Sequence, residues 1–350
     1  MKLLSVLVGL GLLAAAGCGD DASGDDDDVS VDASPADPDA AANTPDAAGT
    51  PDATPPDAAP DVDAFFDPTG THTQYVANTI DVPSNSTEAT ALGQDIDGDS
   101  SIDNALGSIL GSLASMGADP QAAIDGFVAN GEILQIFDVQ ATDLVDADGV
   151  AVRGFAADDG DEPPNPADNF SGSETFVIKP GSPAGSMLLG DITGGNAVAG
   201  PGTMPLSIVI GPGTPPVIVE LVGARFKGGV TATTITNGLL GGAITAEEVD
   251  AVLIPGIAAA LNIMVAEDCV GTTCDPDSAG EDILLLFDDN DDGVITAEEL
   301  RANALIQSLL APDVDLFDAT GAFNPNTDGE NDALSFGVGF TAVGAVFDLP

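Results

Sequence analysis

Short runs with many apolar residues fill the middle of the chain, between Glu132 and Ile235. Seven such runs are rich in β-branched residues, and Gly, Pro, Asn or Asp separates each run from the next. Several short strands joined by turns are typical of an antiparallel β-sandwich or barrel. We therefore predict a β-rich domain over residues 132–236.

An alternating run, Ala333–Phe347, lies near the end of the sequence. A single strand is not stable alone, so we expect residues 312–350 to return a strand to the earlier sheet. Residues 237–311, between the two β regions, follow a helical period. The predicted class is α+β, a sandwich-like or barrel-like β domain with a helical insertion. The buried face of the returning strand is expected to hold Leu334, Phe336, Val338, Phe340 and Ala342.

The first 17 residues have the pattern of an export signal. Met1 and Lys2 give a positive start, and the apolar run Leu3–Ala16 is too short to span a membrane. The run ends in Ala-Ala-Gly-Cys, which resembles the lipobox of bacterial lipoproteins. The resemblance implies that Cys18 carries a lipid and that the protein is anchored in the outer membrane or at the cell surface. The alternative is an ordinary secretory signal with a cysteine nearby.

Residues 18–63 consist mostly of Asp, Ala, Pro, Thr and Ser, with a recurring Pro-Asp-Ala. Such a segment has almost no large apolar side chains to bury, and its prolines and like charges favour an extended chain. We predict a disordered tether. Residues 64–131 are expected to lead into the folded body as an acidic loop and two helices, the first capped by Asp103 and the second by Asp119.

The formal net charge is −52, although 44% of the residues are hydrophobic. This combination indicates a folded body with an acidic surface, which repels nucleic acid and anionic lipid. The chain has one tyrosine, Tyr75, and no tryptophan. Stacking platforms for sugars or bases are therefore scarce. Membrane contact is expected through the N-terminal lipid, and any further partner is an unidentified protein or glycan.

The sequence DDNDDGVITAEEL, from Asp288 to Leu300, crowds several carboxylates together. Neighbouring carboxylates repel one another, and a bound cation would offset the repulsion. The stretch resembles the EF-hand loop at each defining position. The ligands implied by the resemblance are Asp288, Asn290, Asp292, the Val294 carbonyl, Thr296 directly or through water, and Glu299.

Calcium is the cation that this set of oxygens fits. Alternate residues of a tight loop point inward, and Gly293 permits the turn. A bidentate Glu299 favours Ca²⁺ over the smaller, octahedral Mg²⁺. Apolar faces on the predicted helices before and after the loop agree with an EF-hand. The alternative is an acidic turn and a helix with a capping box, which explains Thr296 and Glu299 but not the residues ahead of them.

EF-hands usually occur in pairs, and residues 237–248 are a candidate partner loop. The sequence GAITAEEV in this stretch matches GVITAEEL of the later loop at six of eight positions. Its first half lacks acidic ligands, so we interpret it as a degenerate, metal-free loop whose Ile244 would meet Ile295. The alternative is that two helices begin alike because both use capping-box chemistry.

A second acidic loop begins at Asp95. Asp95, Asp97, Asp99 and Asp103 occupy relative positions 1, 3, 5 and 9, but position 12 has no acid. The loop resembles calcium-binding Asp-x-Asp-x-Asp repeats that lack a closing Glu. Calcium binding and a solvated, helix-capping turn are both open.

Two cysteines, Cys269 and Cys274, flank four residues. In an exported chain an even pair predicts a disulfide that closes a small loop, with free thiols as the alternative.

The sequence offers no recognisable catalytic set. The single histidine, His72, lies beside the tether, and no nucleophile elbow, zinc cluster or phosphate-binding loop occurs. A glycosidase with paired carboxylates is an open alternative, although sugar-stacking aromatics are scarce. We predict a non-enzymatic protein in which Ca²⁺ is structural. A calcium sensor is the other alternative, and sensors usually carry Met-rich apolar faces.

Overall fold

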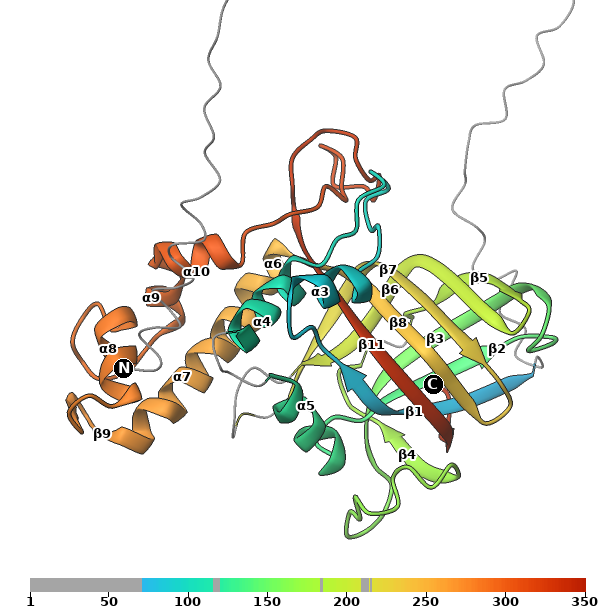
Figure 1. Cartoon of the computed structure of the whole chain (residues 1–350), viewed down its shortest axis with the longest axis horizontal. Helices are drawn as coiled ribbons and strands as arrows, with labels where there is room; N and C mark the ends of the chain where they lie inside the picture. Colours follow the sequence, from blue (N-terminus) through green and yellow to red (C-terminus); the bar gives the residue numbers. More distant parts are fainter. Residues whose placement is uncertain (1–70, 116–119, 183–184, 209–213, 215) are drawn as a thin grey trace, which may run out of the picture.

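A computed structural model of the chain describes residues 71–115, 120–182, 185–208, 214 and 216–350 (Figure 1). The predicted signal peptide, Cys18, the tether and the cap Asp119 lie outside the described residues.

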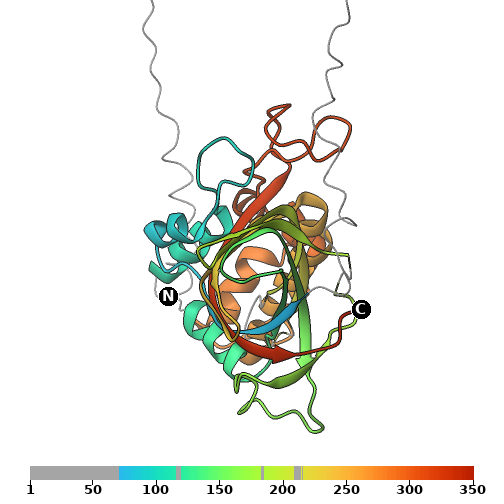
Figure 2. The ribbon, with the colours of Figure 1, turned by 90° about the vertical axis from the view of Figure 1, so that its right-hand side faces the viewer.

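The centre of the molecule is a closed antiparallel barrel of eight strands, seen as a ring in Figure 2. Each barrel strand pairs with the next barrel strand along the chain. The last strand then pairs with the first, for example through Tyr75 and Gly344. The barrel strands are β1 (His72–Asp81), β2 (Gln135–Gln140), β3 (Ala147–Asp159), β5 (Leu188–Thr193), β6 (Asn196–Ile208), β7 (Val217–Val230), β8 (Thr234–Thr245) and β11 (Ala333–Val346).

The prediction of a returning strand is confirmed, because β11 pairs with both β8 and β1. The sheet closes into a barrel and does not form two packed sheets. Strand β1 lies in the stretch 64–131, which the sequence analysis assigned to a loop and helices, so that assignment missed one barrel strand. An extra strand, β4 (Glu174–Ile178), pairs antiparallel with β3 and parallel with β11.

The barrel interior is packed with apolar side chains from alternate strand positions. The five predicted β11 residues all belong to this core. The ring of Phe340 stacks on Phe137 with centroids 4.8 Å apart and lies 5.8 Å from Phe226. On the outer face of β11, a Cβ at Gly337 would lie 2.5 Å from the Leu92 carbonyl oxygen, so a glycine lets a helix approach the strand.

Three helices lie between β1 and β2 and cover the side of the barrel near β11 and β1 (Figure 1). The Asn104 side chain caps the second of them, because its Oδ1 accepts from Gly107 N at 3.0 Å. The prediction that Asp103 caps this helix is therefore wrong. These helices are α3 (Ser86–Leu92), α4 (Ala105–Ser115) and α5 (Pro120–Ala129).

The helical insertion connects β8 to β11 and lies at one end of the barrel (Figure 1). Its buried residues, such as Leu253, Ile283 and Leu300, belong to the same apolar cluster as the barrel interior. The stretch Ala246–Asp268 is long and apolar enough to cross a membrane, a property shared by helices that pack in a protein core. The insertion comprises α6 (Ala246–Glu248), the π-helical turn η1 (Val249–Leu253), α7 (Ile254–Asp268), the hairpin β9 (Cys269–Val270) and β10 (Thr273–Cys274), α8 (Ala279–Phe287), α9 (Ala297–Ala302) and α10 (Ala304–Leu309).

The predicted partner loop, residues 237–248, does not form an EF-hand loop. Most of it belongs to β8, where Ile244 pairs with Leu334 and not with Ile295. The resemblance to the later loop comes from helix capping, since the Thr245 side chain accepts from Glu248 N just as Thr296 accepts from Glu299 N. The helical insertion therefore begins at Ala246.

Candidate metal centre

The loop predicted to bind calcium begins where α8 ends, at Asp288. This carboxylate is only 9% exposed. Its Oδ1 accepts from Asp292 N at 3.2 Å and its Oδ2 from Gly293 N at 2.8 Å. Asp288 therefore fixes the turn from within, with both oxygens facing the loop backbone.

The next two predicted ligands repeat a shorter turn. Asn290 Oδ1 accepts from Asp292 N at 2.9 Å, and Asp292 Oδ1 accepts from Val294 N at 2.9 Å. Asp291 and Gly293 have φ values of 57° and 82°. The side chains at alternate positions thus fold back over the loop, and the left-handed backbone at Gly293 makes the turn possible.

Glu299 closes the loop from the first turn of α9. Its Oε2 accepts from the N and the Oγ1 of Thr296, both at 2.8 Å, and Thr296 completes the predicted capping box. Thr296 N–H lowers the pKa of Glu299, with smaller contributions from the amides of Asn290 and Asp289. The other oxygen, Oε1, is enclosed and forms no hydrogen bond of good geometry in the described part of the chain, although the amides of Asn290 and Asp289 lie close to the carboxylate. The ionised carboxylate therefore lies beside the start of the loop, near the amides of Asn290 and Asp289.

Asn262 of α7 takes the place that a partner loop would hold. Its Oδ1 accepts from Ile295 N at 2.9 Å and its Nδ2 donates to Ile295 O at 2.7 Å. One side chain thus pairs with both backbone groups of Ile295, as a neighbouring strand would.

The hairpin of the predicted disulfide supports the other side of the loop. Cys269 and Cys274 are bonded, with Cα atoms 3.9 Å apart. A Cβ on Gly293 would lie 2.7 Å from the Gly271 carbonyl carbon, so the hairpin and the loop are in close contact. The loop 288–299 is therefore held between α7 and a cross-linked hairpin.

The exit helix predicted after the loop is broken into α9 and α10. Asn303 adopts an extended conformation at the break, and its Oδ1 accepts from Leu305 N and Ile306 N. Its Nδ2 donates to Leu286 O at 3.0 Å. The break therefore ties the exit segment to the entering helix α8.

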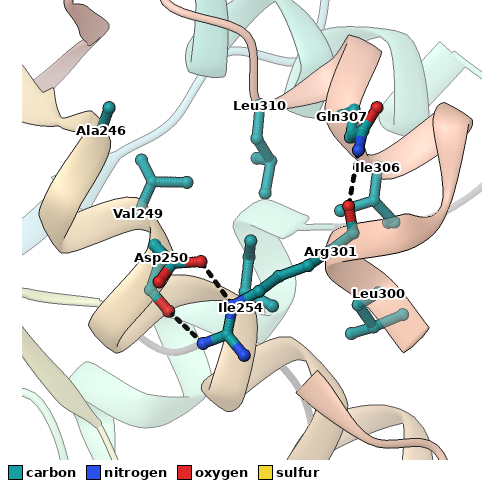
Figure 3. A pocket seen from close by; sticks show the side chains of 9 residues that line it. All are labelled: Ala246, Val249, Asp250, Ile254, Leu300, Arg301, Ile306, Gln307 and Leu310. Carbon is teal, nitrogen blue, oxygen red and sulfur yellow. Dashed lines mark hydrogen bonds and ion pairs between the residues drawn. The ribbon is translucent and has the colours of Figure 1, made fainter. Parts of the chain in front are cut away.

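A groove of about 260 Å³ lies between the exit segment and the start of the insertion (Figure 3). Arg301 crosses it, bonding the Asp250 carboxylate and, at 2.9 Å, the Asp250 carbonyl. Most of the lining side chains are apolar, including Leu300, which follows the loop 288–299 directly.

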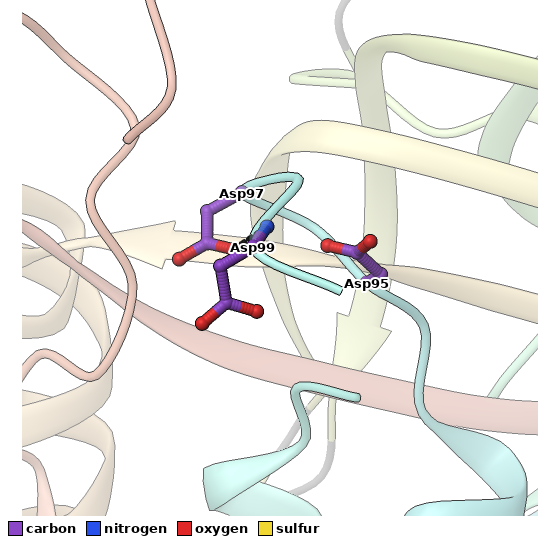
Figure 4. A group of neighbouring side chains, drawn as sticks. All are labelled: Asp95, Asp97 and Asp99. Carbon is purple, nitrogen blue, oxygen red and sulfur yellow. Dashed lines mark hydrogen bonds between the residues drawn. The ribbon is translucent and has the colours of Figure 1, made fainter. Parts of the chain in front are cut away.

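The second acidic loop has the same local construction. Asp95 accepts from Gly98 N and Ser100 N, Asp97 from Asp99 N, and Asp99 from Ser101 N. Gly98 and Ser100 have φ values of 83° and 76°. Ligand oxygens of Asp95, Asp97 and Asp99 all lie within 4.8 Å of one another (Figure 4).

The fourth predicted ligand of this loop, Asp103, is not in the group of three and bonds the loop backbone. Its Oδ2 accepts from Ile96 N at 2.7 Å. Burial raises the pKa of Asp103 to about 6, and the carboxylates of Asp97, Asp313 and Asp99 add to this rise.

The two loops differ in how closely they gather their acids. In the described part of the chain the Asp95 loop forms a group of three carboxylates within 4.8 Å, whereas Asp288, Asp292 and Glu299 do not form such a group. The Glu299 carboxylate is drawn toward Thr296. Val294 is 52% exposed, and its predicted ligand is the backbone carbonyl.

Sequence reasoning missed Asn262 and Asp313. Asn262 lies 33 positions before Ile295, and Asp313 approaches the Asp95 loop only through the fold. Neither residue stands at a motif spacing, so the sequence gives no local signal for either.

No family model, curated protein or solved structure matches the chain.

Proposed function

We propose that the protein binds calcium and that the ion in the loop 288–299 stabilises the helical insertion on the barrel. The Glu299 carboxylate beside the loop start, whose enclosed Oε1 forms no hydrogen bond of good geometry, is the observation that carries the proposal. An acceptor without a donor is costly when buried, and a cation would satisfy it. The side chains of Asp288, Asn290, Asp292 and Glu299, the Val294 carbonyl, and Thr296 directly or through water would hold the ion.

The proposed role is structural because the loop joins elements of a shared core. The ion would link the end of α8 to the start of α9 and reduce repulsion among the acids between them. Ile295 within the loop and Leu300 directly after it are both buried in the apolar cluster that continues into the barrel. Binding only to the folded state would add about 2.7 kcal/mol when free calcium is about 100 times the dissociation constant.

The Asp95 loop is proposed as a second calcium site. Three carboxylates with oxygens within 4.8 Å of one another are a geometry that a divalent ion would bind and whose mutual repulsion it would offset. Asp103 would join the site, because it does not cap the following helix, whose cap is Asn104. A solvated acidic turn without a bound ion is the alternative for this loop.

The proposed location is the outer membrane or cell surface, with a lipid on Cys18 as the membrane contact. The support is the sequence before residue 19 and the disulfide between Cys269 and Cys274, which suits an oxidising compartment. Extracellular calcium is abundant, so weak sites of about 10⁻⁴–10⁻³ M would be filled there.

A calcium sensor is the second candidate function, and the groove in Figure 3 is the observation that favours it. Leu300 and Arg301 line the groove and follow the metal loop directly, so a shift of α9 on calcium binding would widen it. No methionine is among the described residues that line the groove, although sensors usually carry Met-rich faces.

Thermal melting of the purified protein with and without calcium tests the structural role. Millimolar calcium is expected to raise Tm, and Glu299→Gln is expected to abolish most of the rise. Gln still forms a capping box, so the variant removes the charge and keeps the helix start. Glu298→Gln is the matched control, because that neighbouring side chain is 80% exposed. An unchanged Tm at millimolar calcium would refute the proposal, and a calcium-driven rise in dye binding to apolar surface would favour the sensor.

A further inference from the structure

A third acidic segment, residues 313–332, connects the helical insertion to β11. It lies at the same end of the barrel as the Asp95 loop (Figure 1). Val314 and Leu316 of this segment pack with Ile96 in one small apolar cluster. The segment folds back on itself, with Asn324 N donating to Leu316 O at 2.9 Å and Asn326 N to Asp315 O at 3.0 Å.

Asp315 is the unusual residue of this segment, because it is an acid that is only 3% exposed. Its Oδ2 accepts from Gly329 N at 2.7 Å, so the carboxylate faces the turn around Gly329. Its Oδ1 is buried and meets no hydrogen-bond donor among the described residues. Among the described residues, the salt bridges of the basic side chains are formed with other acids, and none of them involves Asp315.

Other carboxylates in the segment show that this situation is specific to Asp315. Asp332 accepts from Leu316 N and Phe317 N, and Asp318 accepts from Thr320 N, Thr320 Oγ1 and Ala322 N. These acids have backbone donors for the charge that they carry. A buried carboxylate with one donor and one bare oxygen is costly unless a further group binds it.

The turn that Asp315 faces is rich in oxygen ligands. Asn326, Asp328 and Glu330 alternate along it and are exposed, so their side chains are free to turn toward an ion. Asp328 uses one oxygen to accept from Glu330 N at 3.0 Å, which leaves its second oxygen. Hard divalent cations, calcium above all, take carboxylate and amide oxygens of this kind in a flexible geometry.

We propose that the segment 313–332 holds a calcium ion on Asp315, with Asn326 and Asp328 completing the site from the surface. The site is separate from the loop 288–299, because none of its residues belongs to that loop. Three acidic loops would then bind calcium at the same end of the molecule as the helical insertion.

A calcium titration of the full chain by two-dimensional amide NMR tests the proposal with the metal alone as the probe. Gly329 N–H reports on Asp315, and Gly293 N–H reports on Asp288. In Glu299→Gln the Gly329 amide is expected to shift and saturate with calcium. If only the loop 288–299 failed to bind calcium, the NMR signal of the Gly293 amide would not shift, whereas the signal of the Gly329 amide would still shift.

Two variants complete the test by calorimetric counting of bound calcium. Asp315→Asn is expected to lower the stoichiometry by one, whereas Asp318→Asn, in the same segment but with its carboxylate satisfied by local donors, is expected to leave it unchanged. A Gly329 amide that does not move up to millimolar calcium in the unmutated chain would overturn the proposal, whether or not Asp315→Asn folds. Unchanged stoichiometry in a folded Asp315→Asn would also overturn it. A buried water would then be the group that binds Oδ1 of Asp315.

Discussion

Asn262 binds Ile295 in both directions, accepting from its N–H at 2.9 Å and donating to its carbonyl at 2.7 Å. Two residues of one chain thus make the pairing that joins two loops in a paired EF-hand. This contact places the centre of the loop 288–299 against α7.

The first prediction concerns this contact. Asn262→Ala is expected to cost about 1–3 kcal/mol of unfolding free energy, since two part-buried hydrogen bonds to Ile295 are lost. Calcium affinity should fall as well, because the loop loses its lateral support. Denaturant unfolding and calorimetric titration measure the two effects. Glu267→Ala, an exposed change on the same helix, is the control, and equal calcium affinity in the two variants would contradict the prediction.

The second prediction concerns Gly293. Its φ is 82°, and an added Cβ would lie 2.7 Å from the Gly271 carbonyl carbon, so both the backbone and the space oppose any side chain. Gly293→Ala is therefore expected to destabilise the protein by more than about 1 kcal/mol and to weaken calcium binding. Gly172→Ala is the matched control, because Gly172 has a φ of 92° but open space around it. If the two variants melt alike, the contact with the hairpin contributes nothing.

The third prediction concerns the disulfide. Replacing Cys269 and Cys274 by Ser frees the hairpin that rests on Gly293, so calcium affinity should decrease together with stability. The chain-entropy model for so short a loop gives a stability loss of about 2 kcal/mol. Calcium titration of the oxidised protein and of the double variant compares the affinities. An affinity that is the same in both would show that the hairpin does not support the loop.

The fourth prediction uses the single tyrosine of the chain. Tyr75 is fully buried and donates to Thr231 O at 2.6 Å. Burial raises the pKa of Tyr75 to about 12, against about 10 for an exposed tyrosine. Between these values the unfolded chain loses the phenol proton and the folded protein keeps it. Stability should therefore fall as pH rises from about 10 to about 12, by on the order of 2 kcal/mol.

Ultraviolet absorbance of the phenolate measures this directly, because no second tyrosine and no tryptophan interferes. The native protein should show no phenolate below about pH 11. A transition near pH 10 while the protein is still folded would contradict the buried position of Tyr75. Tyr75→Phe should remove this part of the alkaline loss of stability.

Some of the structure follows from local pattern, and these parts were predicted. The alternation from Leu334 to Ala342 reflects one face in the core, and Thr296 with Glu299 reflects a helix start. Strand β1 was missed because both of its faces are buried in the middle of the strand, from Tyr75 to Ala77. Tyr75 points into the barrel core, while Val76 packs in a second cluster with Phe176 and Phe347 outside it. Without alternation the stretch has no period-2 signal.

The partner of the metal loop was not predictable for a different reason. The repeated Thr-Ala-Glu-Glu after Ile244 and Ile295 suggested a duplicated loop, but it records only that two helices are capped alike. The residue that contacts the loop, Asn262, is a polar residue in the apolar middle of α7. Its role depends on how α7 lies against the loop, and that packing leaves no trace in spacing. The break at Asn303 also follows from a side chain that prefers capping to helix interior.

The order of the strands has a consequence for how the molecule is made. Thr79 of β1 and Thr341 of β11 bond to each other across 262 positions of sequence. During synthesis, one edge of β1 and one edge of β8 therefore stay unpaired until the helical insertion, the segment 313–332 and β11 have been made. An unpaired strand edge is able to pair with another chain. A chain that stops short of Ala333 lacks β11 and cannot close the barrel. Both edges would stay exposed, and such a chain would be expected to associate with other copies.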